Sequence, residues 1–123
     1  MKALLVGGTA STGPPIVDEL RDRGYEVAIY HRGFHEVDLP KEVEHIHGEP
    51  HFAEAIDADL AGRSFDLVVC TYGRIRYLTE ALRDKTPRLL TVGGFPVMKG
   101  WMAMTDPQHM VHDAPVCNPG YED

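Results

Sequence analysis

A glycine-rich turn between an apolar segment and an amphipathic segment is the feature that most constrains how this chain folds. Residues 2–6 (KALLV) are typical of a short strand that is buried on both faces. The turn Gly7-Gly8-Thr9-Ala10-Ser11-Thr12-Gly13 follows directly. Residues 14–23 then place their apolar side chains on one helical face, with proline at the first position and Gly24 after the last. The order of strand, turn and helix predicts the start of a βαβ unit.

The alternation of strands and helices continues along the chain. Further strands are predicted over residues 26–30, 43–47, 65–70 and 88–92, and further helices over residues 52–60 and 75–82. Strands that alternate with helices of this length predict right-handed crossovers and a parallel sheet. We therefore predict an α/β fold, a Rossmann-like doubly wound sheet of about five parallel strands in the order 3-2-1-4-5, with three helices.

Residues 95–123 break this rhythm. They contain four prolines, four of the five methionines and the single tryptophan, without a clear period. An irregular segment of this length is unusual inside a compact domain. We predict one domain over residues 1–94 and a Pro/Met-rich tail over residues 95–123. The tail has three interpretations: a flap packed on the sheet, the truncated start of a substrate region, or a partly disordered segment.

Composition restricts the partners of the protein. The 123 residues carry a net charge of -7, which disfavours nucleic acid and anionic membrane surfaces. No apolar stretch of the chain approaches the length of about 20 residues that a membrane-spanning helix needs. Its two cysteines, Cys70 and Cys117, form no disulfide or zinc pattern. We predict a cytoplasmic protein with free thiols and with neither a nucleic-acid nor a membrane partner.

The glycine turn is predicted to bind a phosphate group. Glycine after a buried strand permits a tight turn, and Gly13 permits close packing of the helix on the strand. The amides of the turn lie near a helix N-terminus, whose partial positive charge favours a pyrophosphate. The alternative is a purely structural turn. The candidate dinucleotide-binding residues in this segment are Gly7, Thr9, Ala10, Ser11, Thr12 and Gly13.

Several motifs together resemble a known family. They are Gly7-x-x-Ala10-x-x-Gly13, Gly24-Tyr25-Glu26-Val27, Arg32-Gly33, Gly48-Glu49 and Asp66-Leu67-Val68-Val69. Over residues 1–97 the chain resembles the N-terminal Rossmann part of the extended short-chain dehydrogenase/reductase superfamily, of the NAD(P)-dependent epimerase/dehydratase type. The resemblance implies a dinucleotide-binding domain of an oxidoreductase, with a small hydroxylated or carbonyl compound, such as a nucleotide sugar, as the substrate of the parent protein.

Three departures from the family pattern concern cofactor binding and catalysis. Ala10 replaces the middle glycine, and Gly93 and Gly94 occupy the positions aligned with a catalytic serine or threonine. The family's Tyr-x-x-x-Lys pair is absent from the chain. Hydride transfer at a carbinol needs a phenol whose pKa is lowered by a nearby ammonium group. We therefore assign no catalytic residue and expect this chain alone to be catalytically incomplete. The alternative is a non-catalytic NADP-binding or redox-sensing module of the same fold.

The end of the second strand predicts which dinucleotide binds. NAD-selective domains place an acidic residue here, to bind the ribose 2′-hydroxyl. This chain has His31 followed by Arg32, and a guanidinium can bind a 2′-phosphate through two hydrogen bonds. We predict NADP as the cofactor, with NAD as the alternative. The structural alternative is that Arg32 is a solvated side chain at a strand end.

Three further cofactor-binding residues are predicted from their positions. Thr71 and Tyr72 follow the fourth strand, at the edge where ligands bind in such sheets. By the family resemblance, they line the adenosine ribose and approach the nicotinamide. Glu49 is expected near the adenine edge. Tyr72 has an alternative role as an aromatic cover for the end of the sheet.

The histidines and the tail have weaker functional signals. His45, His47 and His51 suggest a metal site, but no carboxylate or cysteine stands at recognisable spacing, so we predict solvent-facing histidines and no metal. His109 and His112 are treated in the same way. A homo-oligomer through the fifth-strand edge or the Met/Trp tail is a further expectation.

Overall fold

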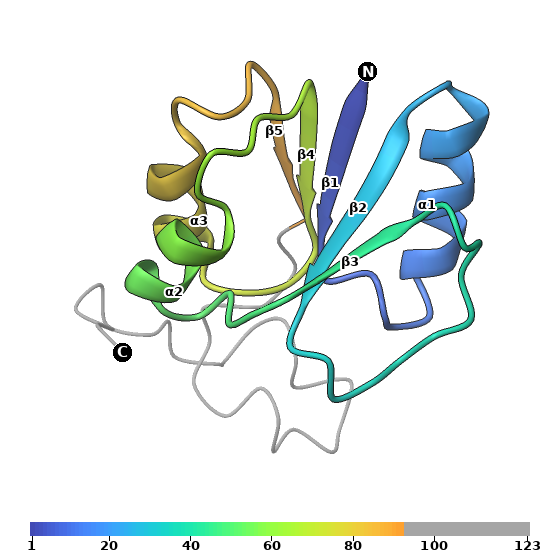
Figure 1. The fold of residues 1–123 in the computed structure, drawn as a ribbon, viewed down its shortest axis with the longest axis horizontal. Coiled ribbons are helices and arrows are strands. Elements are labelled where there is room, and N and C mark those ends of the chain that lie inside the picture. Colours follow the sequence, from blue (N-terminus) through green and yellow to red (C-terminus); the bar gives the residue numbers. More distant parts are fainter. Residues whose placement is uncertain (93–123) are drawn as a thin grey trace, which may run out of the picture. The chain divides into compact units, whose positions relative to one another are not determined.

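The structure, a computed structural model, describes residues 1–92 and contains a single parallel sheet in that part of the chain. Its strands are β1 (Lys2–Val6), β2 (Glu26–His31), β3 (Glu44–His47), β4 (Leu67–Cys70) and β5 (Leu89–Thr91). Its helices are α1 (Gly13–Asp22), α2 (Ala53–Asp59) and α3 (Ile75–Leu82). The strand order is β3-β2-β1-β4-β5, and every pairing is parallel (Figure 1). The predicted fold class is confirmed.

Helices cover both faces of the sheet. Helix α1 lies on one face, and α2 and α3 lie on the other (Figure 1). Alternate residues of β1 divide between the two faces, so that Leu5 packs in the cluster containing Val17 of α1, whereas Leu4 packs in the cluster containing Leu78 of α3. The same alternation in β2 directs Ile29 to the face of α1. This two-sided burial explains why the central strands are almost continuously apolar.

Helix α1 is shaped by the residues at its ends. Thr12 is its N-cap residue but makes no side-chain cap hydrogen bond, and Pro14 and Pro15 occupy the first turn. Gly24 follows the helix with φ +85°, and its N–H donates to Arg21 O at 2.8 Å. The predicted glycine stop is therefore confirmed, because glycine adopts this left-handed conformation without steric cost.

A partly buried hydrogen bond links β2 to α2. Tyr30 is fully buried, and its hydroxyl donates to Asp59 Oδ2 at 2.7 Å. The same carboxylate oxygen accepts the N–H of Glu49 at 3.3 Å. Burial and the neighbouring Asp59 carboxylate raise the pKa of Tyr30, so the phenol remains the donor. Through these two hydrogen bonds, Asp59 holds the segment that follows β3, at Glu49, against β2.

The fifth strand and Cys70 complete the described part of the chain. Leu90 of β5 and Val92 beyond it are exposed, and the expected oligomer contact through this edge stays a prediction. Cys70 is a free, buried thiol, and burial raises its pKa to about 12. Cys117, His109, His112 and the predicted tail lie outside the described residues. Within residues 1–92, no helix has the length and apolar character to cross a bilayer.

Candidate functional site

A pocket of about 210 Å³ opens where β1, β2 and β4 end. In open α/β sheets this carboxyl edge, at the point where the strand order reverses, is the usual ligand site. The volume is below the about 300–1,000 Å³ of a complete small-molecule site, so the pocket accommodates only part of a dinucleotide. The pocket is lined by Gly7, Gly8, Thr9, Ala10, Thr12, His31, Arg32, Gly33, Phe34, His35, Thr71 and Tyr72.

The glycine turn packs tightly against the end of β4. Gly7 and Gly8 have φ values of +101° and +94°, a region that other residues rarely adopt. A Cβ atom on Gly7 would lie 2.6 Å from Thr71 Oγ1 and 3.0 Å from Tyr72 Cβ. Thr71 is itself held in place, because its hydroxyl donates to Val6 O at 3.0 Å. Because Gly7 has no side chain, the backbone of the turn can lie this close to the end of β4, where it lines the pocket.

The turn offers unpaired amides to a ligand. The N–H groups of residues 8–12 donate no hydrogen bond to any other residue in the described range. The first turn of α1 contributes fewer donors, because Gly13 N–H already donates to Ala10 O at 2.8 Å and Pro14 and Pro15 have no N–H. An anion bound here would thus be held mainly by the turn and less by the helix N-terminus.

Arg32 lies close to two aromatic rings at the pocket. Its Cζ is 5.2 Å from the ring centroid of Phe34 and 5.5 Å from that of Tyr72. Contacts of this kind orient a guanidinium without using its N–H donors. Within residues 1–92, no carboxylate forms an ion pair with Arg32. The guanidinium therefore keeps its hydrogen-bonding capacity for an anionic ligand.

The structure brings most of the predicted site residues together. Gly7, Thr9, Ala10, Thr12, His31, Arg32, Thr71 and Tyr72 line the pocket, whereas Ser11, Gly13 and Glu49 do not. Glu49 contacts His51 instead, with its Oε1 at 2.5 Å from Nδ1. Gly8, and Phe34 and His35 of the loop after β2, also line the pocket, although they were not among the predicted site residues. Gly8 could have been predicted, because it lies inside the glycine turn. No sequence pattern indicates the two loop residues.

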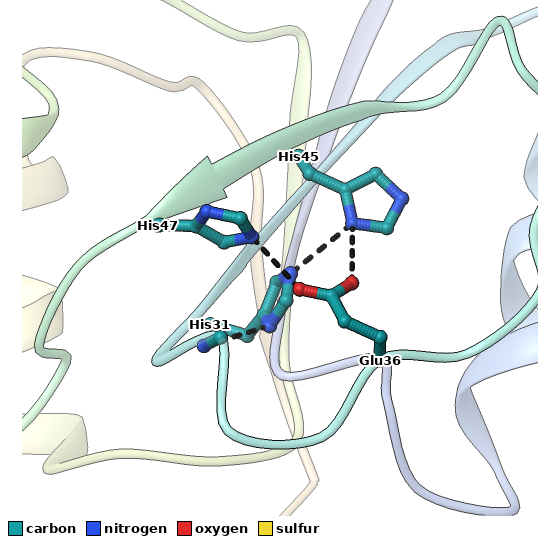
Figure 2. Close-up of polar contacts among 5 residues, drawn as sticks. His31, Glu36, His45 and His47 are labelled. Carbon is teal, nitrogen blue, oxygen red and sulfur yellow. Dashed lines mark hydrogen bonds and ion pairs between the residues drawn. The ribbon is translucent and has the colours of Figure 1, made fainter.

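A second group of polar side chains lies beside the pocket. His31 ends β2, His45 and His47 share one face of β3, and Glu36 reaches them from the intervening loop (Figure 2). One ligand-type atom from each side chain lies within 4.8 Å of the others. His31 is only 3% exposed, and burial lowers its pKa, as do His45 and His47, whereas the Glu36 carboxylate opposes this shift.

Solved structures share the Rossmann-like fold of this chain. They include UDP-sugar 4-epimerases and a short chain dehydrogenase family protein, which confirms the predicted resemblance at the level of the fold. No protein-family model and no curated protein sequence matches the chain.

Three solved structures show the extent of the similarity. A Burkholderia pseudomallei protein described as a putative exported protein is 25% identical, with a TM-score of 0.58 over 80% of this chain and 50% of its own. UDP-glucose 4-epimerase from Thermus thermophilus, in complex with NAD, is 21% identical, with a TM-score of 0.58 over 69% of this chain and 34% of its own. The Bordetella bronchiseptica enzyme WbmG, also in complex with NAD, is 14% identical, with a TM-score of 0.60 over 74% and 36%. The chain thus spans half or less of the length of these proteins.

Proposed function

We propose that residues 1–94 are a domain that binds a nicotinamide dinucleotide, with NADP favoured over NAD. The observation that carries this proposal is the pocket itself, which is lined both by residues of the glycine turn with unpaired amides and by Arg32. Amides suit a pyrophosphate, and an arginine at the end of β2 suits a 2′-phosphate. Two of the similar structures were solved with NAD, which supports the choice of ligand class.

The proposed parent protein is an oxidoreductase of the epimerase/dehydratase or reductase type, acting on a small hydroxylated or carbonyl substrate. When bound, the dinucleotide would supply the hydride, and residues 8–12 with Arg32 would hold its phosphates. In this proposal, residues 95–123 begin the substrate region. The absence of a Tyr-x-x-x-Lys pair and the glycines at 93 and 94 favour a second candidate, a non-catalytic module that binds NADP as a structural or redox signal.

Titration of the chain with NADPH and NADH tests the ligand assignment. We expect tighter binding of NADPH, measured by calorimetry and by the rise in melting temperature that a tight ligand causes. Arg32→Ala should weaken NADPH binding about 10–100-fold, since a hydrogen bond to a charged group contributes about 1.5–3 kcal/mol, and should change NADH binding far less. Arg83→Ala, an exposed arginine after α3, is the matched control.

Two results would contradict the assignment. Equal weakening of NADPH and NADH by Arg32→Ala would remove the role of Arg32 at the 2′-phosphate. Failure of wild-type protein to bind either dinucleotide would remove the proposed function as a whole. Hydride transfer from NADPH to a carbonyl compound, measured on a parent protein that contains this chain, would distinguish the enzyme from the non-catalytic module.

A further inference from the structure

We propose that His31, His45, His47 and Glu36 form a binding site for one divalent transition-metal ion of the zinc type. This proposal goes beyond the dinucleotide-binding function and does not depend on it. From the sequence no metal is expected, because no carboxylate or cysteine stands at recognisable ligand spacing from His45, His47 and His51. In the structure His51 lies apart from the other two and contacts Glu49 and the ring of Tyr72. The residues that do lie beside His45 and His47 are His31 and Glu36, which both precede β3 in the chain.

The parallel pairing of β2 and β3 creates the cluster. His31 is the register partner of His47, and Ile29 is the partner of His45. Paired residues of neighbouring strands project to the same face, and His45 and His47 are two residues apart, so all three imidazoles lie on one side of the sheet. The loop after β2 then brings the Glu36 carboxylate over them (Figure 2).

Three distances within the cluster are close to those between ligands of a tetrahedral metal site. Ligands at the ~2.0–2.2 Å bond lengths of zinc lie about 3.3 Å apart at tetrahedral angles. Here His31 Nε2 lies 3.2 Å from His45 Nδ1. Glu36 Oε2 lies 3.3 Å from His45 Nδ1, and Glu36 Oε1 lies 3.1 Å from His47 Nε2. All four ligand atoms lie within 4.8 Å of one another, so the longest separation has to shorten by up to about 1.5 Å for the four side chains to surround one ion.

Hydrogen bonding alone leaves the cluster with a conflict. Gly33 N–H donates to His31 Nδ1 at 3.1 Å, so the neutral His31 ring carries its proton on Nε2. That proton faces His45 Nδ1, which must then be an acceptor. The same Nδ1 atom lies 3.3 Å from the Glu36 carboxylate, which is also an acceptor. Lone pairs of His45 Nδ1 and of the Glu36 carboxylate therefore face each other, and a cation between these two atoms would bind both.

Metal binding imposes one change on His31. Its Nε2 can coordinate an ion only when the ring proton moves to Nδ1, and Gly33 N–H must then give up its acceptor. Gly33 has φ +78°, and as glycine it can adopt a different conformation at low cost. Imidazole nitrogens with one carboxylate are typical ligands of zinc, nickel, cobalt and copper ions, whereas calcium and magnesium prefer oxygen ligands.

Calorimetric titration of the metal-free chain with Zn²⁺, in the absence of nucleotide, tests the site. We expect one equivalent to bind to this cluster, and Co²⁺ in its place to give the absorption spectrum of a tetrahedral ion. His47→Gln and Glu36→Gln should each weaken Zn²⁺ binding at least tenfold. Both side chains are more than half exposed, so these variants are expected to fold. His51→Gln is the control and should bind Zn²⁺ like the wild-type protein.

Other outcomes would overturn the proposal. Unchanged affinity in both His47→Gln and Glu36→Gln would place any bound zinc elsewhere in the chain. Equal loss of affinity in His51→Gln would do the same. Absence of stoichiometric Zn²⁺ binding by the folded wild-type protein, verified by circular dichroism, would leave only a hydrogen-bonded cluster. None of these results depends on whether NADPH binds, so failure here is distinguishable from failure of the proposed function.

Discussion

Replacement of Gly13 by alanine tests the close approach on which the glycine turn depends. Gly13 begins α1 and is buried. An added Cβ would lie 2.5 Å from Gly8 Cα and closer still to the carbonyl carbon and oxygen of Gly8. All three atoms belong to the backbone, so no side-chain rotation relieves the contact. The helix and the turn would have to separate by roughly 1 Å before the carbon atoms reached an ordinary contact of about 3.5 Å.

The expected cost follows from two opposing effects. Overpacking of a tight contact costs about 1–3 kcal/mol, and a contact with backbone belongs at the upper end of that range. Alanine is favoured over glycine inside a helix by up to about 1 kcal/mol, which acts in the opposite direction. We therefore expect Gly13→Ala to lower the free energy of unfolding by about 2 kcal/mol. For a domain of this size, that corresponds to a melting temperature about 10 °C lower.

Urea unfolding followed by circular dichroism measures this loss. Gly62→Ala is the control, because Gly62 has φ +69° and nothing within 4 Å of the added Cβ. Its cost of about 1 kcal/mol comes from backbone conformation alone. If Gly13→Ala were as stable as the wild-type protein or more stable, helix propensity would have prevailed. That result would contradict the inferred close packing of α1 against the glycine turn.

Two further predictions concern buried polar groups. Tyr30→Phe removes the hydrogen bond to Asp59 and should cost about 1–3 kcal/mol in urea unfolding at pH 7, whereas Tyr25→Phe should have little effect; equal costs would argue against a specific bond. Burial raises the pKa of the Cys70 thiol from 9.0 to about 12 in the folded protein. The unfolded state thus loses its proton first, and stability should fall as pH rises above about 9, by roughly 1 kcal/mol at pH 9.5. Cys70→Ala should lack this contribution, and an identical pH dependence in both proteins would show that the native thiol is not shielded.

The sequence by itself determined the elements and their order. Apolar segments, helical periodicity and glycines at the ends of elements are local signals, because they depend on residues close together in the chain. They located α1, the glycine turn and all five strands to within a few residues. The parallel sheet followed from the alternation of strands and helices. The pocket residues in the turn and at the strand ends could be predicted for the same reason.

Only the tertiary structure decided which side chains meet. The four members of the histidine cluster come from β2, a loop and β3, and the register of two parallel strands sets their distances. No local pattern contains that register, so spacing alone grouped His45 and His47 with His51 and gave no sign that His31 and Glu36 lie beside them. The same applies to Glu49, which the turn after β3 directs toward His51 and away from the pocket. Contacts between distant segments depend on how the whole sheet assembles, which is a property of the packed chain.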